Sequence, residues 1–383
     1  MKVVVGFMPL LDCASLVVAA ERGFAAEEGL DLRLVRETSW ANIRDRLIVG
    51  QFDAAHMLAP MPIAAALGIG HVQTSLIAPM SLGLGGNAIT VSLSLWEEMR
   101  REGAVAGEFL LTQGAALRRV VAAREDSGSE PLTFGMVYPF SCHNYELRYW
   151  LASAGIDPDK DVRLTVIPPP FLVDALRTGQ IDGFCVGEPW NSVAVDAGVG
   201  AIVTPTTALW PHSPEKVLGL RTDWAERYPE ELAALLRALY HAAQWIEAPA
   251  SHAEVARLLS DPRYVGTSAG LLHRALAGRL TLQPGAEPTH LQDFFVPASH
   301  HAAFPWTSHA LWLYTQMVFS GQVEHSPEHL TAARQTYRPD LYRAALKGID
   351  PDIPSTDTKS ERFFDGREFM PDKYTQWLDR KDR

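Results

Sequence analysis

The sequence predicts an α/β protein with two lobes, because a cycle of buried strands and capped helices occurs twice within residues 1–191. The first strand, Val3 to Phe7, is a continuous apolar run typical of a parallel sheet covered on both faces. The second cycle begins at the apolar segment 132–138. This order predicts right-handed crossovers and a cleft between two lobes, with ligands at the carboxyl ends of the strands.

Residues 30–50 form the clearest local unit. Apolar and polar residues alternate over 30–34, which predicts a half-buried strand, and apolar residues at helical spacing follow until Gly50. Thr38-Ser39 supplies an N-cap for that helix, and Trp40 lies in its first turn. Unpaired N–H groups beside an aromatic face suit a small planar anion.

The remaining elements complete the two cycles and add a helical C-terminal region. Strands are predicted at 53–57, 87–92, 162–167 and 181–186. Helices are predicted at 15–23, 60–68, 142–152, 171–177, 224–247, 253–259, 268–280 and 309–319, and two more within 94–130 before a polar loop at 126–130. Three glycines between 83 and 86 are interpreted as the first lobe crossing. We therefore expect lobe I to comprise 1–88 and 206–383, and lobe II 89–205, with 355–383 as a tail over the surface.

Composition excludes several functions. A net charge of −11 makes nucleic acid or an anionic membrane an unsuitable direct partner, and any anion site must be a local arrangement of donors. Three scattered cysteines form neither a disulfide framework nor a zinc motif. No apolar run reaches the roughly 18–20 residues of a membrane span. Because Met1-Lys2 leads directly into the first strand, a cytoplasmic location is expected.

Four side chains are candidates for ligand binding, and each has a structural alternative. Trp40 either faces a ligand or packs in the core, and His143 lies in a first helical turn, two residues after the cap Ser141. Lys216 is expected in a loop returning to the first lobe, where most lysines are merely solvated. Glu188 ends a strand at the predicted cleft, where it also suits a structural turn.

Two further motifs are rejected on the residues alone. The segment 266–270 matches G-x-S-x-G but lacks the preceding buried strand of a hydrolase elbow. His300, His301 and His309 have no carboxylate or cysteine at a recognisable metal-ligand spacing. No metal, cofactor or catalytic residue is therefore expected.

Six longer segments together resemble the nitrate- and bicarbonate-binding proteins of ABC transporters. They are 7–14, 39–45, 53–62, 86–89, 184–191 and 305–312. The resemblance covers nearly the whole chain and implies a type II periplasmic-binding-protein-like fold with a central ligand cleft. It is closest to the cytosolic branch, the assimilatory nitrate/nitrite sensors of the NasS type.

The resemblance also implies a ligand site for nitrate or nitrite. Its residues here would be Trp40, Asn42, Asn87, His143, Pro169 and Lys216, and the candidate Glu188 at the predicted cleft is added to them. Bicarbonate binders resemble these proteins but place an acidic residue at the lysine position and recruit a metal ion. A site made only of donors suits nitrate, which accepts hydrogen bonds and donates none. Lys216→Glu is therefore expected to abolish nitrate binding while leaving the unliganded fold intact.

By resemblance, the function is that of a cytosolic nitrate/nitrite sensor that controls an ANTAR-type, NasT-like RNA-binding antitermination regulator. The alternative is the substrate-binding receptor of an ABC-type nitrate transporter. A third class, an enzyme related to pyrimidine-precursor synthases, lacks a supporting cysteine or histidine cluster, so no enzymatic activity is expected.

Overall fold

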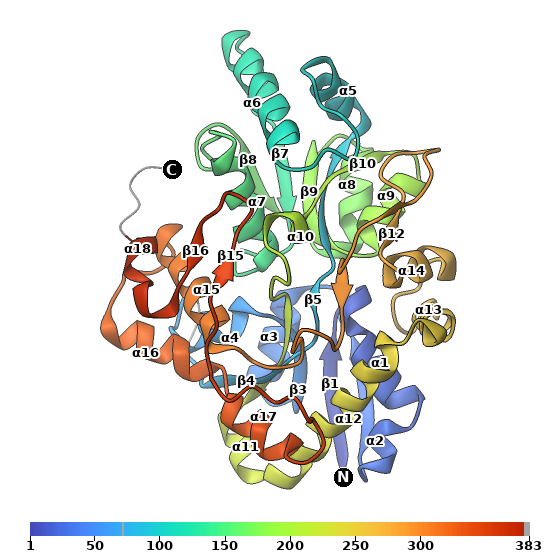
Figure 1. The fold of residues 1–383 in the computed structure, drawn as a ribbon, viewed down its shortest axis with the longest axis vertical. Coiled ribbons are helices and arrows are strands. Elements are labelled where there is room, and N and C mark those ends of the chain that lie inside the picture. The colour runs from blue at the N-terminus through green and yellow to red at the C-terminus, as the bar shows by residue number, and fades with distance from the viewer. Residues whose placement is uncertain (71–72, 379–383) are drawn as a thin grey trace.

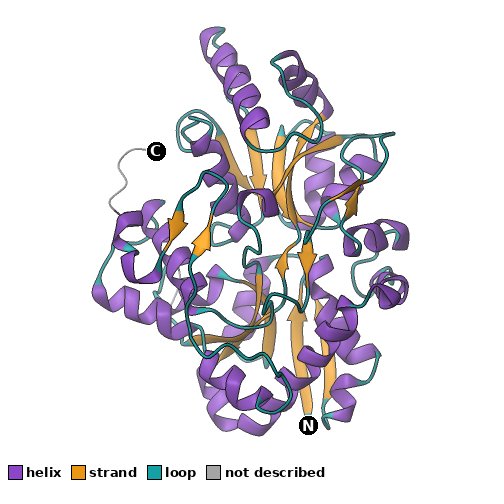
Figure 2. Cartoon of the chain, in the orientation of Figure 1, coloured by secondary structure: helices purple, strands orange, loops and turns teal. Residues whose placement is uncertain are grey.

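Two α/β lobes, one above the other in Figure 1, make up the computed structural model, which describes residues 1–70 and 73–378. Each lobe is built on a five-stranded sheet flanked by helices, as the strands and helices in Figure 2 show. The predicted α/β fold class with two lobes is confirmed. The final residues of the predicted C-terminal tail, 379–383, lie outside the described residues.

The sheet of lobe I has the order β2-β1-β3-β11-β4. Its strands are β1 (Lys2–Phe7), β2 (Asp31–Arg36), β3 (Ala54–Leu58), β4 (Leu76–Ser81) and β11 (Lys216–Arg221). β1 pairs in parallel with β2 and β3, whereas β11 runs antiparallel between β3 and β4. The start of β11 therefore lies at the same edge as the ends of β1 and β3.

The sheet of lobe II repeats this plan with the order β10-β6-β9-β7-β8. Its strands are β6 (Asn87–Ser92), β7 (Thr133–Met136), β8 (Arg163–Val166), β9 (Gly183–Gly187) and β10 (Gly200–Pro205). β7 pairs in parallel with β8 and β9, and β6 runs antiparallel between β9 and β10. The antiparallel β6 thus begins at the edge where β7 and β9 end.

Helices connect and cover both sheets. Those before β11 are α1 (Ala14–Glu21), α2 (Phe24–Glu27), α3 (Trp40–Ile48), α4 (Pro60–Ala66), α5 (Leu93–Arg101), α6 (Leu111–Asp126), α7 (Cys142–Ser153), α8 (Leu172–Arg177), α9 (Trp190–Asp196) and α10 (Thr206–Leu209). Those after it are α11 (Thr222–Arg227), α12 (Pro229–Glu247), α13 (His252–Leu259), α14 (Ala269–Leu276), α15 (Thr307–Phe319), α16 (Pro327–Thr336), α17 (Pro339–Leu346) and α18 (Thr375–Leu378). Single 3-10 turns η1 (Leu11–Cys13), η2 (Pro169–Phe171), η3 (Pro249–Ser251) and η4 (Pro371–Lys373) interrupt the loops.

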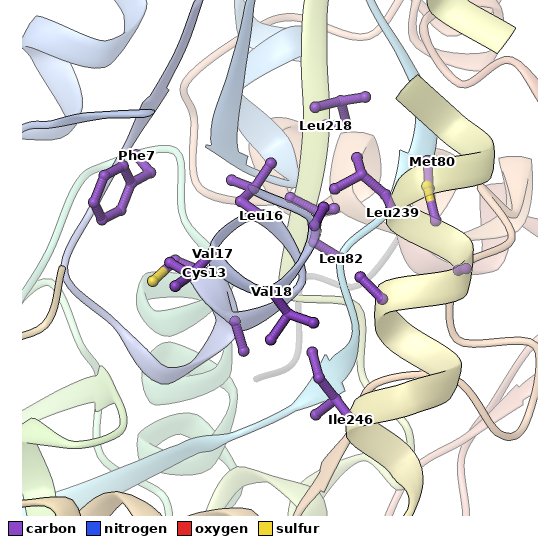
Figure 3. Close-up of a cluster of buried hydrophobic side chains, with 14 of the residues drawn as sticks. Phe7, Cys13, Leu16, Val17, Val18, Met80, Leu82, Leu218, Leu239 and Ile246 are labelled. Atoms are coloured by element: carbon purple, nitrogen blue, oxygen red, sulfur yellow. The ribbon is translucent and has the colours of Figure 1, made fainter. Parts of the chain in front are cut away.

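The core of lobe I joins its sheet to α1 and α12. Figure 3 shows Leu16 and Val18 of α1 on the side of Leu239 and Ile246 of α12, with Val17 on another side of the helix. All of these side chains are fully removed from solvent. Burying an aliphatic side chain contributes about 1.5–3 kcal/mol each, so this face holds α12 against the lobe despite its distance along the chain.

Two crossings connect the lobes, and a third segment lies against them. The first crossing contains β5 (Leu84–Gly85), which pairs with β14 (Phe295–Val296), and the second follows α10. The Gly85 N–H donates to the Ser213 carbonyl at 2.9 Å, so the two crossings are also bonded to each other. Gly85 has φ of 69°, and a Cβ there would lie 2.5 Å from the Phe294 carbonyl oxygen, so only glycine fits.

Three expectations from the sequence are wrong. Lys216 begins strand β11, which lies between β3 and β4, and does not lie in a loop. Residues 355–378 are not simply a surface tail, because they form β15 (Glu361–Arg362), β16 (Glu368–Phe369) and α18, and they bury Trp377. The helix predicted over 268–280 ends at Leu276, because residues 279–280 form strand β12 (Arg279–Leu280), which pairs with β13 (Thr289–His290). Long-range packing decided each of these outcomes.

We expect Trp377→Ala to lower the free energy of unfolding by about 3 kcal/mol or more, because a buried aromatic leaves a large cavity. Trp377 stacks on Tyr149 of lobe II at 6.3 Å between ring centroids and packs on Phe363 at 5.1 Å. Chemical denaturation of the full chain measures the effect. The exposed aromatic Phe171 provides the control, since Phe171→Ala should change the value by about 0.5 kcal/mol or less. Equal losses in both variants would contradict the packing role.

Candidate functional site

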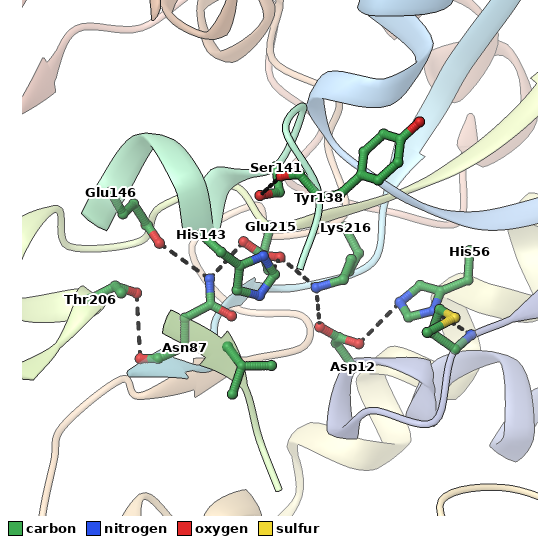
Figure 4. Close-up of polar contacts among 12 residues, drawn as sticks. Asp12, His56, Asn87, Tyr138, Ser141, His143, Glu146, Thr206, Glu215 and Lys216 are labelled. Atoms are coloured by element: carbon green, nitrogen blue, oxygen red, sulfur yellow. Dashed lines mark hydrogen bonds and ion pairs between the residues drawn. The ribbon is translucent and has the colours of Figure 1, made fainter. Parts of the chain in front are cut away.

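A buried polar cluster lies where the two lobes meet, at the strand edges described above (Figure 4). Lobe I contributes Asp12 from η1 after β1, His56 of β3, Trp40 of α3 and Glu215-Lys216 at the start of β11. Lobe II contributes Asn87 at the start of β6 and His143 and Glu146 of α7. The cluster therefore joins residues that are far apart in sequence.

The Lys216 ammonium is the centre of this cluster. Its Nζ lies 2.8 Å from Asp12 Oδ2 and 2.5 Å from Glu215 Oε1, and the side chain is 0% exposed. Burial alone would lower the pKa of Lys216, but the two carboxylates reverse that effect and hold it above its usual range. Lys216 thus stays charged inside the protein.

Asp12 is held ionised by the Lys216 ammonium on one side and the His56 imidazole on the other. Burial favours its neutral form, but Lys216 and His56 keep the pKa of Asp12 well below its usual value. His56 Nε2 lies 3.0 Å from Asp12 Oδ1, while its Nδ1 accepts a hydrogen bond from the Met8 N–H at 3.4 Å. This arrangement places the proton of a neutral His56 on Nε2, facing Asp12.

A second pair of carboxyl groups lies on the lobe II side. Asn87 Nδ2 donates to Glu215 Oε2 at 2.6 Å and to Glu146 Oε2 at 3.2 Å. Burial and the neighbouring Glu215 charge raise the pKa of Glu146 to about 8, so this carboxyl is largely protonated at pH 7. Burial also raises the pKa of Glu215, although Lys216 opposes that shift.

Two buried ring groups complete the cluster without using all of their polar atoms. Neither Trp40 Nε1 nor His143 Nδ1 has a hydrogen-bond partner among the described residues. His143 Nε2 lies 3.3 Å from Glu215 Oε1, and Lys216 Nζ lies 5.5 Å from the centroid of the Trp40 ring. Burial and the Lys216 charge lower the pKa of His143 well below its usual value, so the ring is neutral. Unpaired buried polar atoms of this kind call for a ligand or another explanation.

The structure corrects the expectation of a site made only of donors. Asp12, Glu146 and Glu215 lie beside Lys216, and none of them was among the predicted site residues. Asp12 follows the carboxyl end of β1 and Glu215 immediately precedes Lys216. Both could therefore have been recognised from the sequence as candidate site residues. Glu146, one helical turn after His143, could be recognised only once α7 was placed.

Of the remaining predicted site residues, Glu188 lies at the junction, whereas Asn42 and Pro169 offer it no hydrogen-bond donor. Glu188 is buried at the junction, where its carbonyl accepts the Leu11 N–H at 2.8 Å, and burial raises the pKa of its carboxyl to about 7. Asn42 is exposed and its amide donates to Glu37, so it points away from the cluster. Pro169 is buried in η2 and has no donor to offer.

The expected result of Lys216→Glu also changes. Lys216 is fully buried between Asp12 and Glu215, so glutamate there would bring a third carboxylate into contact with two others. Leaving buried charges uncompensated is strongly destabilising. This variant would damage the fold itself, and it cannot serve as a clean test of ligand binding.

The fold and the junctional cluster together define a class, the two-lobed periplasmic-binding-protein-like proteins. Within it, the chain belongs to the NMT1-like family, whose model matches residues 1–260. Among the described residues, no helix has the length and apolar character needed to cross a membrane.

Similar proteins are components of nitrate and bicarbonate transport systems. The nitrate/nitrite binding protein NrtA of Synechococcus elongatus is 35% identical over 98% of this chain and 85% of its own. The nitrate import ATP-binding protein NrtC of Synechocystis is 38% identical over 96% of this chain, which spans about half (53%) of that protein. The crystal structure of the periplasmic nitrate-binding protein NrtA from Synechocystis matches with a TM-score of 0.91 at 28% identity, covering 100% of this chain and 98% of that one.

We expect the pH dependence of stability to differ between the wild type and Glu146→Gln. The folded pKa of Glu146, about 8, lies above its ordinary 4.5, so the folded state binds more protons between these values. Wild-type stability should therefore fall relative to the variant as pH rises through this window, by up to about 1.4 kcal/mol per pH unit.

Denaturation curves from pH 5 to 8 measure this difference. Replacing the exposed Glu287 by Gln is the matched control, and its difference from the wild type should stay nearly constant with pH. A flat difference for Glu146→Gln as well would show that Glu146 is ionised in the fold.

Proposed function

We propose that this protein binds nitrate or nitrite at the junction of its lobes and serves as the substrate-binding receptor of an ABC-type nitrate transporter. The observation that carries the proposal is the fully buried Lys216 ammonium, with the Trp40 ring and the unpaired His143 ring nitrogen in the same cluster. The names of its relatives, nitrate/nitrite binding protein and nitrate import protein, support the choice of anion.

The chemistry of the cluster suits a small planar anion. Nitrate accepts hydrogen bonds and donates none, and the junction holds an ammonium, an indole N–H, an imidazole and an amide. Charge-assisted hydrogen bonds are about twice as strong as neutral ones, so Lys216 would contribute most of the attraction. No catalytic step is needed for this role.

Ligand binding would also fix the position of the lobes. Trp40 and Lys216 belong to lobe I, whereas Asn87 and His143 belong to lobe II. An anion that contacts both sets is bound more tightly when the lobes are together, so it shifts the population toward that arrangement. A direct bond between the lobes already exists on the rim, where Arg44 Nη1 donates to the Tyr138 hydroxyl at 2.6 Å.

The conservative variant Trp40→Phe tests the site without removing a buried charge. Loss of the indole N–H should weaken nitrate binding about tenfold or more, the effect of losing one hydrogen bond to a charged group. Trp312→Phe is the matched control, because Trp312 is equally buried and its Nε1 is also without a described partner, yet it packs on Trp210 and Phe363.

Isothermal titration with nitrate, nitrite, bicarbonate and sulfate gives the measurement. We expect binding of nitrate or nitrite in preference to the other two anions, with the Trp312 variant unchanged. Equal weakening in both tryptophan variants would place the anion elsewhere, and absence of nitrate binding by the wild type would refute the proposal.

The carboxyl groups predict a second property, proton uptake on binding. Lys216 already faces two carboxylates, Asp12 and Glu215, with neutral His56 and His143 beside them. Another anion in this buried site is disfavoured unless a carboxylate is protonated. Nitrate affinity should therefore fall as pH rises through about 8, where Glu146 becomes charged.

Titration at pH 9, where Glu146 is mostly ionised before nitrate binds, in buffers of different ionisation enthalpy counts the protons taken up. We expect a positive uptake that approaches one proton per nitrate. An observed heat that is independent of the buffer, together with an affinity that does not change between pH 6 and 9, would contradict this coupling.

The alternative proposed from the sequence is a cytosolic sensor that controls an ANTAR-type, NasT-like regulator. The relatives named above are transporter components, and they favour the receptor over the sensor. Gel filtration of this protein with such a regulator separates the two roles. A complex that dissociates when nitrate is added would establish the sensor, whereas separate elution under both conditions supports the receptor.

A further inference from the structure

Three polar side chains from distant segments meet beside the crossings between the lobes. His212 lies between α10 and β11, Asp293 lies just before β14, and His300 lies between β14 and α15. The histidines of 300–309 do not form this group among themselves. His309 is buried and lies 2.9 Å from Glu361, and His301 packs near Trp306.

The ligand atoms of these three residues have the spacing of a coordination shell. His212 Nε2 lies 3.4 Å from Asp293 Oδ2, His300 Nε2 lies 3.7 Å from the same oxygen, and all three atoms are within 4.8 Å of one another. Tetrahedral zinc with bonds of about 2.0–2.1 Å separates neighbouring ligand atoms by about 3.3–3.4 Å. The two histidine-to-aspartate distances are within about 0.4 Å of this spacing, and side-chain rotation can bring all three ligand atoms around one ion.

The arrangement of these three side chains favours a bound metal cation over an ion pair between a protonated histidine and Asp293. The His212 and His300 rings are stacked, with centroids 4.0 Å apart and planes at 24°, an arrangement that disfavours charge on both. An imidazole ligates a metal ion through a nitrogen that carries no proton. The nearby Lys359 has its ammonium 3.2 Å from Glu361 Oε1, so its charge is compensated.

The backbone and the exposure of the group agree with an open metal site. His212, Asp293 and His300 all have positive φ, a conformation shared in the described chain only by two other non-glycine residues, Leu110 and His301. Such conformations cost energy and concentrate at functional sites. The side chains of Asp293 and His300 are 39% and 48% exposed, so an ion can enter and keep water as a fourth ligand.

We propose that His212, Asp293 and His300 bind a divalent transition-metal ion, with zinc as the best match. Two imidazole nitrogens and one carboxylate oxygen form a borderline donor set that selects zinc over the oxygen-preferring magnesium and calcium.

The location gives this ion a structural consequence. His212 belongs to the second crossing, three residues before Glu215, and Asp293 precedes Phe294, whose carbonyl accepts the Gly86 N–H of the first crossing at 2.6 Å. Zinc would thus tie the segment 291–301 to both connections between the lobes. The ion should raise the melting temperature of the chain, because it binds the folded and not the unfolded arrangement.

Titration of the full chain, first stripped with a chelator, with zinc alone tests the proposal without any nitrate. We expect one high-affinity ion per chain, a higher melting temperature, and no comparable effect of magnesium or calcium. Cobalt in place of zinc should give the visible absorption of a four-coordinate site. Failure of nitrate binding would leave these results unaffected, so the two proposals are tested separately.

His212→Asn and His300→Asn should each weaken zinc binding at least tenfold, since asparagine tolerates positive φ but is a poor zinc ligand. His301→Asn is the matched control, being exposed and at the same φ of 56° as His300. Melting curves of all three in chelator should match the wild type, which verifies folding. The proposal is overturned if the wild type binds no zinc, or if His301→Asn weakens binding as much as the other two.

Discussion

The buried Lys216 ammonium is the interaction on which the junction of the two lobes depends. A charge without access to water is stable there only because Asp12 and Glu215 contact it directly. Those carboxylates in turn contact His56 of lobe I and Asn87 and His143 of lobe II. The result is a polar network whose members cannot be replaced singly without leaving an uncompensated group.

This constraint shapes how an anion can be bound. A buried lysine without carboxylate partners would attract nitrate strongly. Its charge would, however, be uncompensated whenever no anion is bound, which is strongly destabilising. Carboxylates neutralise the ammonium, and the protonated Glu146 next to them limits the excess of negative charge. Under the proposed function, anion affinity would thereby depend on the protonation of buried carboxyl groups as well as on the lysine.

The same junction carries the connections between the lobes. The crossings at 82–86 and 206–215 are bonded to each other and to the segment that holds Asp293. Glu215-Lys216 begins immediately after the second crossing, and the His212 imidazole lies within it. The proposed zinc site and the proposed anion site are therefore connected through the same short piece of backbone.

Local pattern by itself determined the two α/β cycles, the helix capped by Ser39, and the helix capped by Ser141, because periodicity and caps act over a few residues. The resemblance of several motifs to a known family also predicted that Trp40, Asn87, His143 and Lys216 belong to one site. Only the tertiary structure decided that Lys216 is a strand residue paired with Asp12, that Asn42 points away, and that His212, Asp293 and His300 meet. Burial, compensation of charge and metal-ligand geometry depend on contacts between distant segments, and no local pattern encodes which segments meet.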